Sequence, residues 1–313
     1  MGKNEAALRD PEATSWNKRA TKHRGWPVWK GRDLIGRMTG ATLRGLLVAL
    51  LIATPALMLP DVASDSSQVT VLVALLAAFL TFVEYNSTLP SIVEFRDAPP
   101  FNRLRFTALF LTVVMLSAII KGQTEPTMMT GALTSIGTIV GNAIDFPYSP
   151  VRLVVLMLPE GSDLAIVRSV RTSAGLAYLI SLTAMTAFLV LVRILGWPTR
   201  RGAFNVWVNL PLFDPTGGGD VLYRLQRDAR INIALGFLLP FIIPAVVKAA
   251  SDLVDPITLS NPQTMIWTIS AWAFLPASMI MRGIAMAKIA DMIEDKRRRA
   301  YASAEGEDGF QTA

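Results

Sequence analysis

Long apolar runs constrain the fold of this chain more than any other feature. A helix that crosses the hydrocarbon core of a bilayer needs roughly 20 mostly apolar residues. Of the 313 residues, 52% are hydrophobic, and they cluster into stretches longer than a soluble core requires. The stretches of sufficient length are about 43–60, 68–84, 104–120, 172–195, 231–249 and 264–285. The sequence therefore predicts an all-α, polytopic integral membrane protein with about six transmembrane helices.

Basic residues in the connecting segments predict the orientation of these helices, because Lys and Arg accumulate in cytoplasmic loops. Basic clusters occupy 1–44, 85–103, 196–230 and 287–299, whereas the short links 61–67 and 250–263 hold aspartates and no base. Six spans with both termini in the cytoplasm place these clusters on one side. The exception is the non-cytoplasmic link 121–171, which contains Lys121, Arg152, Arg168 and Arg171. We expect a multi-pass protein of a bacterial cytoplasmic (inner) membrane.

The same pattern predicts three parts: a basic cytoplasmic N-terminal arm (1–40), a six-span membrane domain (41–286), and a cytoplasmic helical extension with a disordered tail (287–313). Within the link 121–171, residues 127–144 are weakly apolar. A seventh span there would put the basic tail outside, so we predict a re-entrant or surface-lying helix. Gly137 and Gly141 in this segment have the GxxxG spacing that permits close helix packing.

The amino-acid composition limits the kinds of chemical site that the chain can form. There is no cysteine and one histidine, which excludes disulfides, thiolate nucleophiles and a His-rich metal site. We predict no cofactor, no metal site and no catalytic residues. The net charge of +6 is interpreted as a record of topology and not as a sign of nucleic-acid binding.

Residues 213–233, FDPTGGGDVLYRLQRDARINI, contain a turn signature followed by a helix with three arginines. Asp220 lies at the predicted N-cap. Its carboxylate occupies the position that a bound phosphate would need, which argues against a phosphate loop. The sequence predicts an interfacial helix that turns into the fifth span. Its arginines either contact anionic lipid head groups or a partner, or only enforce topology. They are Arg224, Arg227 and Arg230.

Pro240 and Pro244 lie in the fifth predicted span. Each proline removes a backbone donor and clashes with the carbonyl four residues back. We therefore predict that this span is bent or locally unwound. It is then either a broken helix that lines a substrate site or a static kink satisfied by neighbouring helices, and the second interpretation is favoured.

The link between the second and third spans is richer than a connector requires, because it mixes charges, prolines and apolar residues. It is interpreted as a cytoplasmic docking loop that binds the link 196–230 or a partner protein. The alternative is a solvated loop whose arginines only hold the topology. The charged docking residues are Glu94, Arg96, Asp97 and Arg103.

No Asp, Glu, Lys or Arg lies in the middle of a predicted span. Arg282 falls near a span end, where a long side chain can reach the interface. Because intramembrane charge marks many ion-coupled transporters, its absence argues against a proton-coupled pump.

Three function classes follow. The first is a non-catalytic accessory, assembly or scaffold component of a larger membrane complex. The second is a transporter or channel for a small or lipophilic solute that uses the proline-containing span 231–249. The third is a lipid-active enzyme at the cytoplasmic face that uses Asp214, Asp220 and the arginines beside them. The expected partners are anionic membrane lipids and either a membrane protein or further copies of this chain.

Overall fold

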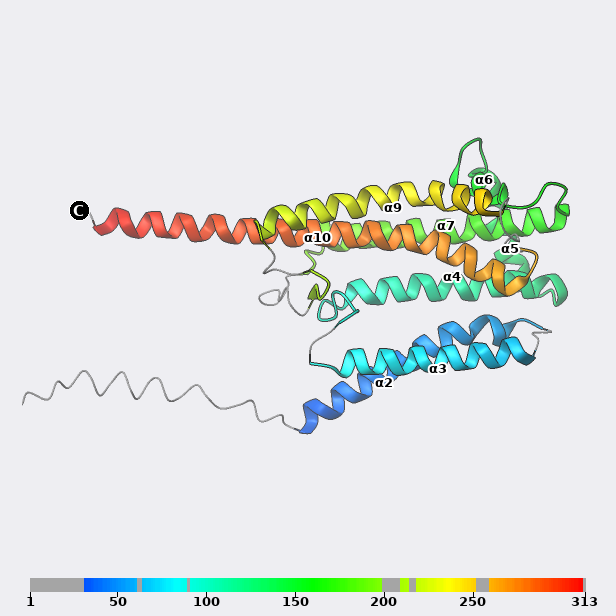
Figure 1. Cartoon of the computed structure of the whole chain (residues 1–313), viewed down its shortest axis with the longest axis horizontal. Coiled ribbons are helices and arrows are strands. Elements are labelled where there is room, and N and C mark those ends of the chain that lie inside the picture. Colours follow the sequence, from blue (N-terminus) through cyan, green and yellow to red (C-terminus); the bar gives the residue numbers. More distant parts are fainter. Residues whose placement is uncertain are drawn as a thin grey trace, which may run out of the picture.

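The computed structural model describes residues 31–60, 64–88, 91–198, 209–213, 218–251 and 259–311. All of these are helix, turn or loop, and none is strand. The long helices run roughly along one common direction (Figure 1). They are α2 (Gly31–Met58), α3 (Ser64–Asn86), α4 (Pro100–Thr124), α5 (Met128–Ala143), α6 (Pro150–Val155), α7 (Leu164–Arg193), α9 (Val221–Ser251) and α10 (Pro262–Gln311).

Six helices are long and apolar enough to cross a membrane, and they are α2, α3, α4, α7, α9 and α10. This confirms the all-α fold and the six predicted apolar helices. The segment 127–144 forms α5, whose 16 residues extend about 24 Å at 1.5 Å per residue. Helix α5 is therefore too short to count among the helices that could cross a membrane.

The bundle has two parts (Figure 1). Helices α4, α7, α9 and α10 form a four-helix body, and α2 and α3 form a hairpin beside it. The hairpin meets the body mainly through α2 against α4. We call the end of the bundle that carries residues 87–99 the loop end, and the end that carries α5 and α6 the cap end. Buried apolar clusters fill the body at both ends.

Glycines bring helices of the body into backbone contact. A Cβ built on Gly236 of α9 would lie 2.7 Å from the carbonyl oxygen of Pro276 in α10. A Cβ on Gly283 of α10 would lie 2.7 Å from the carbonyl oxygen of Ala229 in α9. These two antiparallel helices therefore touch through their main chains at two levels.

Two sequence predictions about helix ends are wrong. The arginine-bearing segment does not turn before the fifth span, because α9 is one continuous helix from Val221 to Ser251. The tail after residue 299 is helical to Gln311, because its alanines and glutamates favour helix even where hydropathy is low. Residues 31–40, assigned to the N-terminal arm, begin α2, and the rest of the arm lies outside the described residues.

Candidate functional site

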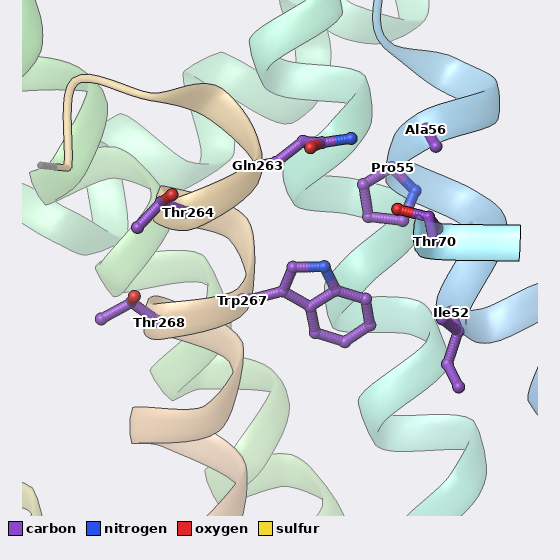
Figure 2. Close-up of a pocket in the computed structure, with 8 residues that line it drawn as sticks. All are labelled: Ile52, Pro55, Ala56, Thr70, Gln263, Thr264, Trp267 and Thr268. Carbon is purple, nitrogen blue, oxygen red and sulfur yellow. The ribbon is translucent and has the colours of Figure 1, made fainter. Parts of the chain in front are cut away.

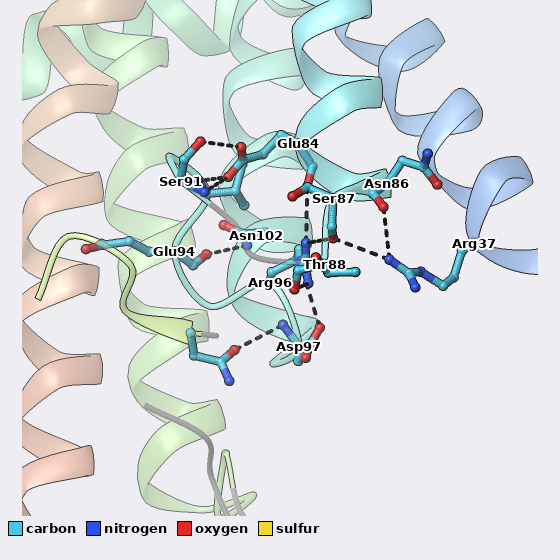
Figure 3. Close-up of polar contacts among 12 residues, drawn as sticks. Arg37, Glu84, Asn86, Ser87, Thr88, Ser91, Glu94, Arg96, Asp97 and Asn102 are labelled. Carbon is cyan, nitrogen blue, oxygen red and sulfur yellow. Dashed lines mark hydrogen bonds and ion pairs between the residues drawn. The ribbon is translucent and has the colours of Figure 1, made fainter. Parts of the chain in front are cut away.

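The described residues of the loop after α3, 87–88 and 91–99, fold inward over the loop end of the body, and one carboxylate sets the shape of this loop (Figure 3). Glu84 is buried. Its Oε1 atom accepts the backbone N–H groups of Ser91, Ile92 and Val93 at 2.7, 2.7 and 2.9 Å, and its Oε2 atom accepts the Ser91 hydroxyl at 2.8 Å. Hydrogen bonds to an ionised group are among the strongest in proteins. Glu84 therefore fixes the chain reversal after α3.

Two arginines hold the C-terminus of α3 (Figure 3). Arg96 donates to the carbonyl oxygens of Glu84 and Ser87 at 3.1 and 2.8 Å. Arg37 of α2 donates to those of Asn86 and Ser87 at 2.9 and 3.3 Å. The last carbonyls of a helix have no intrahelical partner, and positive charge is favourable at this end of the helix dipole. Both side chains therefore cap the helix.

The loop docks on the link 196–230, through Asn209. The Phe95 N–H group donates to the Asn209 carbonyl oxygen at 2.6 Å, and the Asp97 N–H group donates to the Asn209 Oδ1 atom at 3.0 Å. The fully buried Phe95 ring lies 4.4 Å from the Phe101 ring, centroid to centroid. Phe95 has a φ of 54°, which residues other than glycine rarely adopt. These contacts hold it there.

Glu94 forms the most enclosed ion pair of the site. Arg282 of α10 contacts both carboxylate oxygens, with Nε 2.6 Å from Oε2 and Nη2 2.8 Å from Oε1. The Glu94 side chain is 8% exposed and that of Arg282 is 26% exposed. Arg282, which lies near a predicted span end, thus pairs with a carboxylate that the inward-folded loop supplies against α10.

A cavity of about 310 Å³ lies between the hairpin and the body at the loop end. We call it the arginine cavity. Its lining includes one arginine from α2, one from the loop and one from α4, namely Arg44, Arg96 and Arg103, and no carboxylate. The Arg44 guanidinium lies over the Tyr85 ring, 4.6 Å from its centroid. Arg96 is also 3.7 Å from the exposed carboxylate of Asp97. Sequence reasoning missed Arg44 and Tyr85, because nothing in a helix sequence shows which loop it faces.

A second cavity, of about 380 Å³, lies between the hairpin and α10 at the cap end (Figure 2). The Ser66 hydroxyl of α3 donates to Gln263 of α10 at 2.9 Å beside it. The lining is neutral and consists of Ile52, Pro55, Ala56, Thr70, Gln263, Thr264, Trp267 and Thr268. Of the two cavities between hairpin and body, only the one at the loop end is therefore lined by charged residues.

At the cap end, Asp145 neutralises two of the basic residues that conflicted with the predicted topology. Its side chain is 6% exposed, and its oxygens lie 2.8 Å from Arg152 Nε and 2.7 Å from Arg171 Nε. These contacts are ion pairs without the alignment of hydrogen bonds. The carboxylate comes after α5, and the arginines lie on α6 and α7.

The arginines of α9 do not join the arginine cavity. Arg224 lies over the Phe213 ring at 4.9 Å. Arg227 is 3.4 Å from the carboxylate of its neighbour Asp228. Arg230 is exposed. The structure therefore spreads these three side chains over one surface of α9.

Gly137 and Gly141 of α5 lie where α5 crosses α7. A Cβ on Gly137 would lie 2.8 Å from the Thr172 side chain, and one on Gly141 would lie 2.7 Å from the Arg171 carbonyl oxygen. The matching residue of α7 is Gly175, whose Cβ would lie 2.4 Å from the Gly141 Cα. Glycines on both helices thus permit this crossing.

Pro240 and Pro244 do not unwind α9, which is helical through both. Because Pro244 has no N–H group, the Pro240 carbonyl loses its helical donor. The indole N–H of Trp272 in α10 donates to this carbonyl at 3.0 Å in a buried bond. A neighbouring helix therefore satisfies the group that the proline frees.

Replacing Trp272 with Phe is expected to lower the free energy of unfolding by about 2 kcal/mol, because the Pro240 carbonyl is then buried without a donor. In a Pro244→Ala background the same change should cost under about 1 kcal/mol, because the introduced alanine supplies the missing helical N–H group. Unfolding curves of the four proteins in detergent measure the difference. An equal cost in both backgrounds would show that Trp272 acts through packing alone.

Among the described residues, no group of three or more His, Cys, Asp or Glu is placed to hold a metal ion. The described polar groups of the loop end bind mainly one another, and the arginine cavity lies beside them. The chain matches no protein-family model, no curated protein and no solved structure.

Proposed function

We propose that this chain is a non-catalytic component of a larger membrane assembly, acting as an accessory, assembly or scaffold protein. In this proposal both termini, and therefore the loop end, face the cytoplasm of a bacterial inner membrane. The distribution of Lys and Arg supports this orientation.

The use of buried carboxylates supports a structural role over proton coupling or catalysis. Glu84 binds loop amides, Glu94 binds Arg282, and Asp145 binds two arginines. A general acid or base must be within reach of a substrate proton. These three carboxylates are committed to protein partners.

The observation that carries the proposal is the length of α10. Its 50 residues extend about 75 Å, whereas the hydrocarbon core of a bilayer is about 30 Å thick. Figure 1 shows its C-terminal part projecting far past the other helices. Arg297 pairs with Asp220 at 2.9 Å, and the side chains at 298–303 are exposed. The projecting helix provides a surface for a partner outside the membrane.

The test is native purification in a mild detergent, followed by native gel electrophoresis and mass spectrometry. We expect the full chain to migrate in stoichiometric amounts with a larger complex. Ala300→Pro breaks the projecting helix and should reduce this association several-fold. Ala300→Gln keeps a good helix former at the same position and should leave it unchanged. Migration of all three proteins as monomers, or equal association of all three, would overturn the proposal.

The structure offers less support for the other two function classes. A broken helix for transport is not present in α9, because the freed carbonyl of Pro240 is bound by Trp272. Of the two carboxylates suggested for catalysis, Asp214 lies outside the described residues. Asp220 caps α9, and its hydrogen bonds from Arg297 and from the Leu222 N–H group lower its pKa. The Asp220 carboxylate is thus engaged in contacts that hold the start of α9 and the end of α10.

A further inference from the structure

We propose that the arginine cavity binds the phosphate of an anionic phospholipid head group. The cavity is layered along the bundle axis. Its arginines lie toward the loop end, and about one helical turn deeper it is lined by Leu47 and Val48 of α2, Thr81 of α3 and Phe106 of α4. A head group attached to an acyl chain has the same order of polar and apolar parts.

An excess of positive charge points to an anion. The three lining arginines have no carboxylate among the cavity residues, and the one carboxylate paired with them, that of Asp97, is exposed and 3.7 Å from Arg96. Glu84, the nearest candidate along α3, already accepts three backbone N–H groups. Arg103 makes no side-chain hydrogen bond or ion pair with a described residue, and Arg44 contacts the Tyr85 ring by cation–π stacking. Like charges in a partly enclosed space repel, so a bound anion would stabilise this arrangement.

The residue types fit a phosphate in particular. A guanidinium presents a planar fork of N–H donors that matches phosphate oxygens, and it is more weakly hydrated than an ammonium group. Arg44, Arg96 and Arg103 line the space from three separate elements. Basic pockets between membrane helices are known to bind the head groups of anionic lipids.

The apolar floor favours a lipid over a free phosphate. Leu43 and Leu47 are 58% and 36% exposed, and both line the cavity. They would lie against the first part of an acyl chain. The cavity at the cap end, also between hairpin and body, is lined by neutral residues only (Figure 2). A soluble anion would use the arginines and leave this apolar surface uncovered.

The experiment is a lipid titration of the purified full-length protein in a neutral detergent, read by native mass spectrometry. The probes are phosphatidylglycerol and phosphatidylcholine with identical acyl chains. We expect phosphatidylglycerol to bind more tightly, and Arg44→Gln with Arg103→Gln to weaken its binding about tenfold or more, since two charge-assisted contacts are lost. The matched control, Arg227→Gln with Arg230→Gln, removes the same charge from α9 and should change binding less than twofold.

Equal weakening in the control, or equal binding of the two lipids, would overturn the proposal in favour of general surface attraction. Glycerol phosphate that displaces phosphatidylglycerol at similar concentration would overturn it in favour of a soluble anion. If the double variant does not fold, Arg103→Gln alone serves, because its side chain holds no described contact. Unchanged binding in that variant and in Val48→Phe, which fills the apolar floor, would also overturn the site.

Discussion

Replacing Glu94 with Ala is expected to lower the free energy of unfolding by about 3 kcal/mol. The Arg282 guanidinium would then stay within the body without its bidentate partner, and breaking an enclosed ion pair from one side typically costs 3–5 kcal/mol. The partial exposure of Arg282 places the effect at the lower end of this range.

Chemical or detergent-induced unfolding, followed by circular dichroism, measures this effect. Asp97→Ala is the matched control, because it removes a carboxylate from the same loop that is 62% exposed and 3.7 Å from Arg96. Its cost should stay under about 1 kcal/mol. Changing both Glu94 to Ala and Arg282 to Met should cost less than Glu94→Ala alone. If the two single carboxylate variants were equally stable, the enclosed pair would have no special role.

Replacing Gly175 with Ala is expected to destabilise the protein by about 3 kcal/mol. The added Cβ would lie 2.4 Å from the Gly141 Cα and 2.5 Å from its nitrogen, and no side chain rotation can move those backbone atoms away. The helices α5 and α7 must separate, and overpacking of this kind costs 1–3 kcal/mol or more. The Thr138–Thr172 hydroxyl contact of 3.1 Å would lengthen as well.

Gly131→Ala provides the control in the same pair of helices. Gly131 lies within α5 with nothing within 4 Å of a built Cβ, so the substitution should raise stability by about 0.5–1 kcal/mol through lower backbone entropy in the unfolded chain. Unfolding midpoints of the two variants should therefore move in opposite directions. A similar shift in both would contradict the close crossing of α5 and α7.

The helices themselves could be predicted, because each apolar run is local in the sequence and approaches the length of a spanning helix. The start of α9 could also be predicted, since aspartate is a favoured N-cap residue. In the structure Asp220 accepts the Leu222 N–H group at 3.1 Å. The GxxxG spacing of Gly137 and Gly141 identified one side of a helix crossing. The partner Gly175 is not part of such a spacing, so the sequence did not show that it lies at the crossing.

What could not be predicted depends on groups distant in the sequence. Glu94 and Arg282 are 188 residues apart, and a single sequence does not show that a loop folds inward to join them. The Trp272 N–H group binds a carbonyl freed by a proline on another helix, a partner that lies 32 residues away in the sequence. The arginine cavity joins α2, α3, α4 and a loop, so no local pattern contains it.

The contacts between α9 and α10 also determine which parts of the bundle can move. Sliding one of these helices along the other would break the buried Trp272–Pro240 bond and would drive side chains into the places now left open by Gly236 and Gly283. The pair is thus locked in one axial register. The described contacts between the hairpin and the body are chiefly those of α2 against α4 and the Ser66–Gln263 hydrogen bond. Neither is a close backbone contact of this kind, and a cavity lies between the two parts at each end. Rearrangement within the membrane is accordingly expected as a rocking of α2 and α3 against a rigid frame.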